Sequence, residues 1–151
     1  DMIRRIGPVT SAAATRNIDG VTVRRTDLIS ADQSGGIAVV ATEPDRFAIA
    51  PVEAINRAVA RAGRTLAEVD LVEINEAFAA MVLCCLHDLP ELDRERVNVH
   101  GGAIAYGHPL GASAARVVVD LCRELGRRGG GVGVAAACIG VGLGIAIVGE
   151  V

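Results

Sequence analysis

The sequence contains no lysine, and all fifteen of its basic residues are arginines. Without a lysine amine the chain cannot form a Schiff base, which excludes a complete pyridoxal-phosphate enzyme and a Schiff-base aldolase. Tryptophan is also absent and aromatic residues make up only 2% of the chain, so a platform that stacks single-stranded nucleic acid is not expected. The net charge of −3 and the absence of basic runs longer than two residues also argue against a nucleic-acid partner.

Long hydrophobic runs and paired cysteine motifs are missing as well. No stretch reaches the roughly 18 consecutive apolar residues that a membrane-spanning helix needs, so we expect no membrane partner. No apolar signal run follows the first five residues, and a cytoplasmic location is the default expectation. The four cysteines form no Cys-x-x-Cys pair, so we expect no metal site, and a reducing compartment is the simplest interpretation.

The residues that are present predict one α/β domain. Hydrophobic residues make up 51% of the 151 positions, which is enough for a sizeable core built from Ala, Val, Ile and Leu. Apolar periodicity and glycine or proline punctuation predict alternating strands and helices. The expected strands span residues 37–41, 69–74, 132–138 and 143–148, and the expected helices span residues 51–62, 76–86 and 110–125.

Several details of this pattern carry further expectations. The glycines at 140 and 142 indicate a C-terminal antiparallel hairpin, so the sheet should be mixed. The helix at 76–86 is apolar on nearly all sides, which predicts burial on most sides. Residues 21–29 alternate loosely and could form an edge strand or an arm. The apolar side of the helix at 110–125 is expected to comprise Ala114, Val118, Leu121, Cys122 and Leu125.

Three segments are richer in reactive groups than a fold requires. They are NEAF at residues 75–78, GGAIAYGHPLGAS at residues 101–113, and CIGVG at residues 138–142. Taken singly, each has an ordinary explanation: Asn75 as a cap or turn residue, His108 as a loop residue, and Cys138 as a small core residue. Together, an amide, an imidazole and a thiol arising from three loops suit chemistry that passes through an enolate or a thioester.

These three segments resemble the three C-terminal motif blocks of the thiolases. The strings NEAF, GGAIAYGHPLGASAAR and CIGVGLGIAIV occur in the family's order and at its intervals. Two segments that lead up to and include the first motif are similar to a helix and a strand of the same family: APVEAINRAVARAG and EVDLVEINEAFAA. Three ordered motifs are far more specific than one. The resemblance covers residues 44–151, and it implies half of a thiolase-like layered fold preceded by a poorly matched segment, residues 1–43.

The resemblance also implies a role for each matching residue. His108 would activate a cysteine thiol and donate to the thioester oxyanion, and Asn75 would hold a water in the same oxyanion hole. Cys138 would be the acid/base cysteine that moves the α-proton of the acyl group. The backbone N–H of Gly140 would help to form a second oxyanion hole. Ala77 and Phe78 would line the acyl pocket.

The implied activity is thiolysis of 3-ketoacyl-coenzyme A or the reverse condensation of acyl-coenzyme A, in fatty acid metabolism. Coenzyme A thioesters would be substrates, and no bound cofactor is expected. The expected partners are acyl-coenzyme A or 3-ketoacyl-coenzyme A, with either further copies of the chain or a thiolase half that carries the nucleophilic cysteine.

The sequence also departs from the family. Nothing in it matches the N-terminal half that carries the nucleophilic cysteine, and Cys84 and Cys85 lie in an apolar helix and are not expected to replace it. The segment between Gly36 and Pro51 is too short to contain the family's first helix and second strand. We therefore expect one helix–strand unit of the family's fold to be missing from this chain. Val141 stands where the last motif block commonly has glycine.

Two functional hypotheses of different classes follow. In the first, the chain is an acyltransferase half that is inactive without a nucleophile-bearing partner. In the second, it is a non-catalytic module that binds acyl-coenzyme A or supports an assembly. The chain itself would be a piece of a longer thiolase, a small subunit or a decayed relative.

Overall fold

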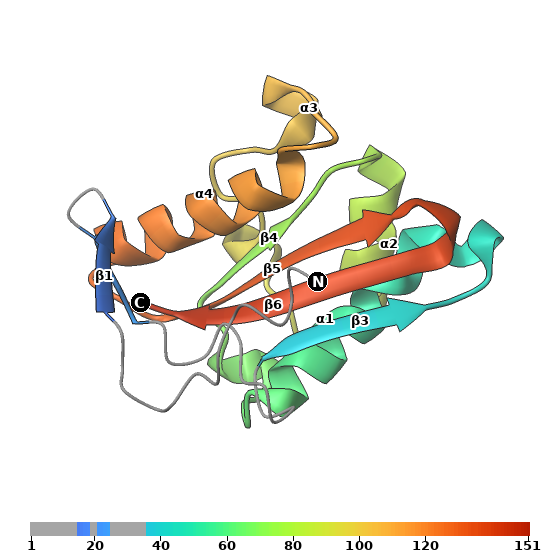
Figure 1. The fold of residues 1–151 in the computed structure, drawn as a ribbon. Coiled ribbons are helices and arrows are strands. Elements are labelled where there is room, and N and C mark those ends of the chain that lie inside the picture. The colour runs from blue at the N-terminus through green and yellow to red at the C-terminus, as the bar shows by residue number, and fades with distance from the viewer. Residues whose placement is uncertain (1–14, 19–20, 25–35) are drawn as a thin grey trace, which may run out of the picture.

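The computed structural model describes residues 15–18, 21–24 and 36–151 (Figure 1). Four strands form a mixed sheet in the order β3-β6-β5-β4, in which β5 pairs antiparallel with β6 and parallel with β4, and β3 pairs antiparallel with β6. These strands are β3 (Ile37–Ala41), β4 (Leu71–Ile74), β5 (Val132–Ile139) and β6 (Leu143–Glu150). The mixed sheet and its C-terminal hairpin confirm the fold class predicted from the sequence.

Helices cover both faces of this sheet (Figure 1). On one face, α1 (Ala50–Arg61) and α2 (Ala79–Asp88) enclose the larger apolar core, and on the other face α4 (Ser113–Arg128) packs against β4 and β5. The remaining helical segments are short: η3 (Pro44–Ile49), η4 (Leu66–Glu68), η5 (Arg94–Arg96), α3 (Ala103–Tyr106) and η6 (Gly140–Gly142). A separate antiparallel pair is formed by β1 (Thr15–Ile18) and β2 (Val21–Arg24).

A short extended segment continues the sheet beyond β4. Val97 forms a parallel bridge to Val72, and the chain then turns at Asn98, which has a positive φ of 48°. The Asn98 side chain, in place of backbone groups, continues the hydrogen bonding to β4. Its Oδ1 accepts from the Ile74 N–H at 2.8 Å and its Nδ2 donates to the Ile74 carbonyl at 2.9 Å. The absence of one helix–strand unit relative to the family stays a prediction.

Most predicted elements are confirmed with small shifts at their ends. The helix predicted at 51–62 is α1, and Gly63 ends it with a φ of 66°. The strand predicted at 69–74 begins at Leu71. Of the loosely alternating residues 21–29, the first four form β2, and residues 25–29 lie outside the described part of the chain.

The helix predicted at 76–86 differs in both its start and its burial. It begins at Ala79, because Phe78 is extended and residues 75–78 form a loop instead of a first turn. Only one side is buried, through Met81, Cys85 and Leu89, whereas Leu83 is 54% exposed. The prediction of burial on most sides is therefore wrong for this chain, and an apolar face of α2 is left open to solvent.

The side of α4 that faces the core agrees with the prediction at Leu121 and Leu125 and differs from it at other positions. The helix packs on the sheet through Val117, Leu121 and Leu125. Ala114 is exposed, and Val118 and Cys122 are only half-buried. The helix carries two adjoining apolar stripes, and a sequence pattern alone does not tell which of them meets the sheet.

Candidate functional site

The first and third motifs lie at the same edge of the sheet. Because β4 and β5 are parallel neighbours, their carboxyl ends meet there, with Ile74 opposite Ala136 and the Asn75 N–H donating to the Ala136 carbonyl at 2.8 Å. Cys138 lies two residues further along β5. This edge is therefore where the sequence predicted that the reactive groups would be presented.

The second motif brings its histidine to this edge. His108 lies in the loop between α3 and α4, and its Nε2 is 3.4 Å from Nδ2 of Asn75. Asn75 is 2% exposed, and its other side-chain atom, Oδ1, is buried without a hydrogen-bond partner among the described residues. The structure thus places two of the three predicted groups, Asn75 and His108, in direct contact. The Asn75 Oδ1 remains a buried acceptor without a partner among the described residues.

Ser113 is a further member of this cluster that the sequence reasoning missed. Its Oγ lies 2.6 Å from Nδ1 of His108 and 3.0 Å from the carbonyl oxygen of Pro109. Ser113 is the first residue of α4 and is 2% exposed. A serine one helical turn after a His-Pro pair, at a helix N-terminus, was the available signal.

Cys138 occupies a different setting on the neighbouring strand. Its side chain is half-buried and packs against the apolar core under α1 and α2, near the thiol of Cys85. Within the described residues no hydrogen bond joins Cys138 to His108 or Asn75. Burial raises the pKa of the Cys138 thiol, so the resting group is a neutral thiol and the lowered pKa that would favour a base is not found in this chain alone.

The loop that carries His108 is held by Glu76 from the first motif. Glu76 Oε2 accepts from the Ile104 N–H at 2.9 Å, and Oε1 accepts from Nδ2 of Asn98 at 3.1 Å. Gly102 lies so close that a Cβ there would be 2.6 Å from the Glu76 carboxyl carbon. The first motif therefore supplies both Asn75 and the carboxylate that anchors the histidine loop.

The loop after Cys138 is constrained on its inner side. A Cβ on Gly142, whose φ is 83°, would lie 2.3 Å from the Thr42 carbonyl oxygen. Val141, at the tip, adopts a φ of 61° and a ψ of 32° and is 79% exposed. Gly140 begins this turn directly after β5 and is exposed, so its backbone lies at the same edge as Asn75.

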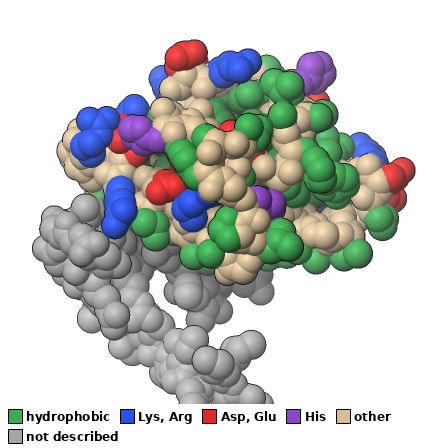
Figure 2. All heavy atoms as spheres, turned by 90° about the horizontal axis from the view of Figure 1, so that it is seen from above, with side chains coloured by type: hydrophobic (Ala, Val, Ile, Leu, Met, Phe, Trp, Pro, Cys, Tyr) green, Lys and Arg blue, Asp and Glu red, His purple; other side chains and the backbone are tan. Residues whose placement is uncertain are grey.

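Exposed apolar side chains surround the site. Ala77 is half-buried and Phe78 is 61% exposed, with its ring 6.0 Å from that of Phe47. Figure 2 shows hydrophobic side chains gathered over one side of the molecule seen from above, and charged side chains mainly over the other. The three motif segments contribute six large exposed hydrophobic residues: Phe78, Ile104, Tyr106, Leu110, Ile139 and Val141.

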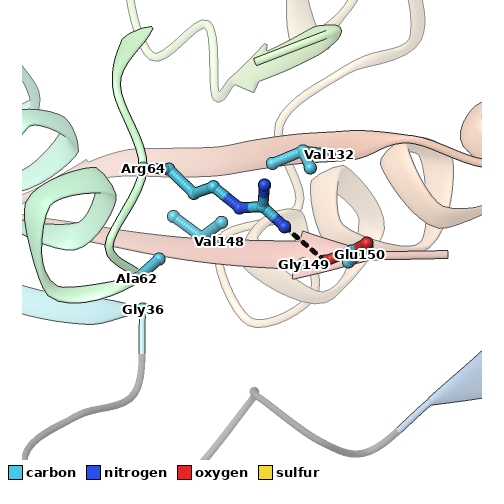
Figure 3. A pocket seen from close by; sticks show the side chains of 7 residues that line it. All are labelled: Gly36, Ala62, Arg64, Val132, Val148, Gly149 and Glu150. Atoms are coloured by element: carbon cyan, nitrogen blue, oxygen red, sulfur yellow. Dashed lines mark hydrogen bonds and ion pairs between the residues drawn. The ribbon is translucent and has the colours of Figure 1, made fainter. Parts of the chain in front are cut away.

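Two cavities lie away from this edge. A small one of about 150 Å³ is found at the opposite end of the sheet, where Arg64 pairs with Glu150 at 3.0 Å (Figure 3). A larger one of about 440 Å³ lies between α4 and the glycine loop and is lined by Tyr106, Arg116 and Glu124, among others. In the part of the chain that the structure describes, no group of three or more His, Cys, Asp or Glu side chains could hold a metal ion.

A buried carboxyl group lies on β4 just before Asn75. Glu73 is 5% exposed, and burial, reinforced mainly by the negative charge of Asp120, raises its pKa from 4.5 to about 7. Glu124 shows the opposite effect, since hydrogen bonds from Arg127, His100 and Arg128 lower its pKa. Sequence reasoning singled out neither carboxylate, because burial and partners on other elements decide their charge.

The fold and the motif loops define an α/β domain of the kind that thiolases use, and comparison with known proteins agrees. The thiolase C-terminal domain family model matches residues 29–151. The chain belongs to that family.

Curated and solved relatives give the same result. The chain is 53% identical over 105 residues to the mouse protein "Acetyl-CoA acetyltransferase, cytosolic", an alignment that covers 70% of this chain and 26% of the relative. It is 42% identical over 153 aligned positions to Acetyl-CoA acetyltransferase of Chromobacterium violaceum, covering 95% of this chain and 39% of the relative. Human mitochondrial 3-ketoacyl-CoA thiolase, solved in complex with CoA, superposes with a TM-score of 0.73 at 47% identity, over 76% of this chain and 29% of that one.

The chain therefore spans between about a quarter and two fifths of the length of these relatives. Among the described residues, no helix is both long and apolar enough to cross a membrane.

Proposed function

We propose that this domain is the C-terminal half of a thiolase-type acyltransferase, which acts on acyl-coenzyme A or 3-ketoacyl-coenzyme A and requires a nucleophilic cysteine from an N-terminal half. The observation that carries the proposal is the contact between Asn75 and His108 at the sheet edge, where Cys138 also lies near the end of β5. The names of the relatives support acyl-coenzyme A chemistry.

In the proposed reaction, His108 takes the proton from the partner's cysteine thiol at Nε2. The thiolate attacks the thioester carbonyl, and the coenzyme A thiolate leaves and takes up the proton that His108 holds at Nε2. The oxyanion of the tetrahedral intermediate is stabilised by His108 and by a water held at Asn75. This sequence leaves an acyl group on the partner's cysteine.

Cys138 would then move the proton at the α-carbon of the second acyl group, in condensation or in its reverse. The neighbouring turn would place the Gly140 N–H at the second developing oxyanion, where one donor typically contributes about 3 kcal/mol. Because burial raises the pKa of Cys138 in this chain, its activation as a base is assigned to the assembled protein. Ala77 and Phe78 would line the acyl group.

The exposed apolar faces support the need for a partner half. The outer side of α2 exposes Leu83, and the outer side of α4 exposes Val119, which is 45% open to solvent. Such faces are usual where a domain packs against another domain. A second copy of this chain would cover them in the absence of a partner half, and a cytoplasmic location fits the name of the mouse relative.

The proposal is tested by measuring thiolysis of acetoacetyl-coenzyme A with and without a purified thiolase N-terminal half. The chain alone should give no turnover, because no nucleophile is available to accept the acyl group. Adding the half should restore turnover, and adding a half whose nucleophilic cysteine is replaced by alanine should not. Acyl-coenzyme A binding without activity in any combination would favour the non-catalytic binding module instead.

A further inference from the structure

Ser113 contacts both the His108 imidazole and a backbone carbonyl, and these two contacts restrict which imidazole nitrogen can carry the hydrogen. The residue is 2% exposed, so water does not compete freely for its hydroxyl group. Its Oγ contacts the imidazole Nδ1 at 2.6 Å and the Pro109 carbonyl oxygen at 3.0 Å. A hydroxyl group has one hydrogen to donate and can accept at its lone pairs.

The carbonyl oxygen of Pro109 can only accept, so the contact at 3.0 Å uses the serine hydrogen. Donation from a serine hydroxyl to the carbonyl four residues earlier is a known local side-chain-to-backbone pattern. With its hydrogen used in this way, Ser113 Oγ is an acceptor toward His108, and Nδ1 of the imidazole must carry a hydrogen.

The contact on the opposite side of the imidazole ring indicates the same tautomer. Nε2 faces the Nδ2 amide nitrogen of Asn75 at 3.4 Å, and that nitrogen is a donor only. A neutral imidazole with its hydrogen on Nδ1 has its lone pair on Nε2, which suits this donor. If Ser113 instead donated to Nδ1, the Nε2 hydrogen would face two amide hydrogens.

We propose that Ser113 is a positioning residue that keeps neutral His108 in the Nδ1–H tautomer, so that proton uptake and release take place at Nε2. The proposal rests on the proposed function only for the role of His108 as a base. Protonation at Nε2 leaves the Nδ1–H bond to Ser113 unchanged, so the serine would hold the ring through both charge states without moving.

Nitrogen-15 NMR of the labelled chain tests this directly, through the couplings of each imidazole ring proton to both ring nitrogens at a pH where the ring is neutral. The chain has three histidines, and His87 and His100 serve as controls in the same spectrum. For His108 we expect a protonated Nδ1 and an unprotonated Nε2. Ser113→Ala should lower the ratio of the Nδ1–H to the Nε2–H form about fivefold, the equivalent of one hydrogen bond.

Two further variants separate a specific effect from a general one. Ser113→Thr keeps the hydroxyl group and should retain the wild-type tautomer. Thr42→Val removes a hydroxyl group that donates to Glu43 and should leave His108 unchanged.

A wild-type His108 with its hydrogen on Nε2 would overturn the proposal, and so would a tautomer ratio that is the same in Ser113→Ala. The wild-type spectrum decides even if a variant fails to fold. Either result would leave the acyltransferase proposal standing, whereas failure of the activity assay would leave the tautomer unaffected.

Discussion

Some residues at the sheet edge could be identified from the sequence, and others could not. Asn75 and His108 were identifiable from their motifs, because their positions follow a strand end and a glycine loop. Ser113 was harder to identify, since a helix N-terminal serine has many ordinary uses. Glu73 could not be identified, because its raised pKa comes from burial against α4 and from charges on that helix.

Glu73 should make stability fall as pH rises. The pKa of its carboxyl group is about 7 in the folded chain and near 4.5 when unfolded, so the folded state holds the proton more tightly. Stability from this group is complete below pH 4.5 and is lost as pH rises toward 7, by roughly 2–3 kcal/mol in total. Glu73→Gln should remove most of this slope in urea titrations at pH 5 and pH 8, and Glu91→Gln, an exposed control, should not. An unchanged slope in Glu73→Gln would contradict the assigned pKa.

Cys138 should react slowly with alkylating agents in the chain alone. Burial raises the pKa of its thiol, and the thiolate is the reactive form. Mass spectrometry after timed treatment with iodoacetamide at pH 7 should show Cys84, which is exposed, modified well before Cys138. Labelling of Cys138 should accelerate as pH is raised above 9. If Cys138 were modified first at pH 7, its thiol would already be activated without a partner.

At the scale of elements, the apolar pattern predicted the strands and helices well and their surroundings less well. The glycines after α1 and α4 end these helices as expected. The exposed side of α2, and Ala114 on α4, were predicted to be buried, because a pattern shows which side chains are apolar but not which surface covers them. The delayed start of α2 has a local cause, since Asn75 and Glu76 make contacts that an initial helical turn would break.

The turn after Cys138 carries a residue poorly suited to it. Val141 is β-branched and adopts a left-handed conformation, which costs about 1–2 kcal/mol relative to a residue without a Cβ. Allowing for the greater freedom of glycine in the unfolded chain, Val141→Gly should stabilise the domain by roughly 0.5–1 kcal/mol in urea denaturation.

The same substitution at Val119 provides the contrast. Val119 is also exposed but lies within α4, where Val→Gly should destabilise by a few tenths of a kcal/mol to about 1 kcal/mol. Equal loss of stability in both variants would mean that the turn is not strained.

In the described part of the molecule, large apolar side chains are exposed on both sides of the sheet, Leu83 on α2 and Val119 on α4. Sedimentation velocity over a range of concentrations should therefore show reversible self-association of the chain. Leu83→Glu and Val119→Glu, which place a charge on each face in turn, should weaken it, and Val39→Glu on the edge strand β3 serves as a control. A monomer at high concentration would remove the support for a missing partner surface.

The central claim is that His108 and Cys138 perform different steps of one acyl transfer, and it is tested most directly by acyl-enzyme formation in the assembled protein. The chain, joined to a thiolase N-terminal half, is incubated with acetyl-coenzyme A, and intact-mass spectrometry measures acetylation of the nucleophilic cysteine. Cys138→Ala should still be acetylated at close to the wild-type extent but should give no acetoacetyl-coenzyme A. His108→Ala should lose most of the acetylation rate, typically 10²–10⁴-fold for a lost general base. Rapid acetylation in His108→Ala, or full condensation activity in Cys138→Ala, would contradict the account.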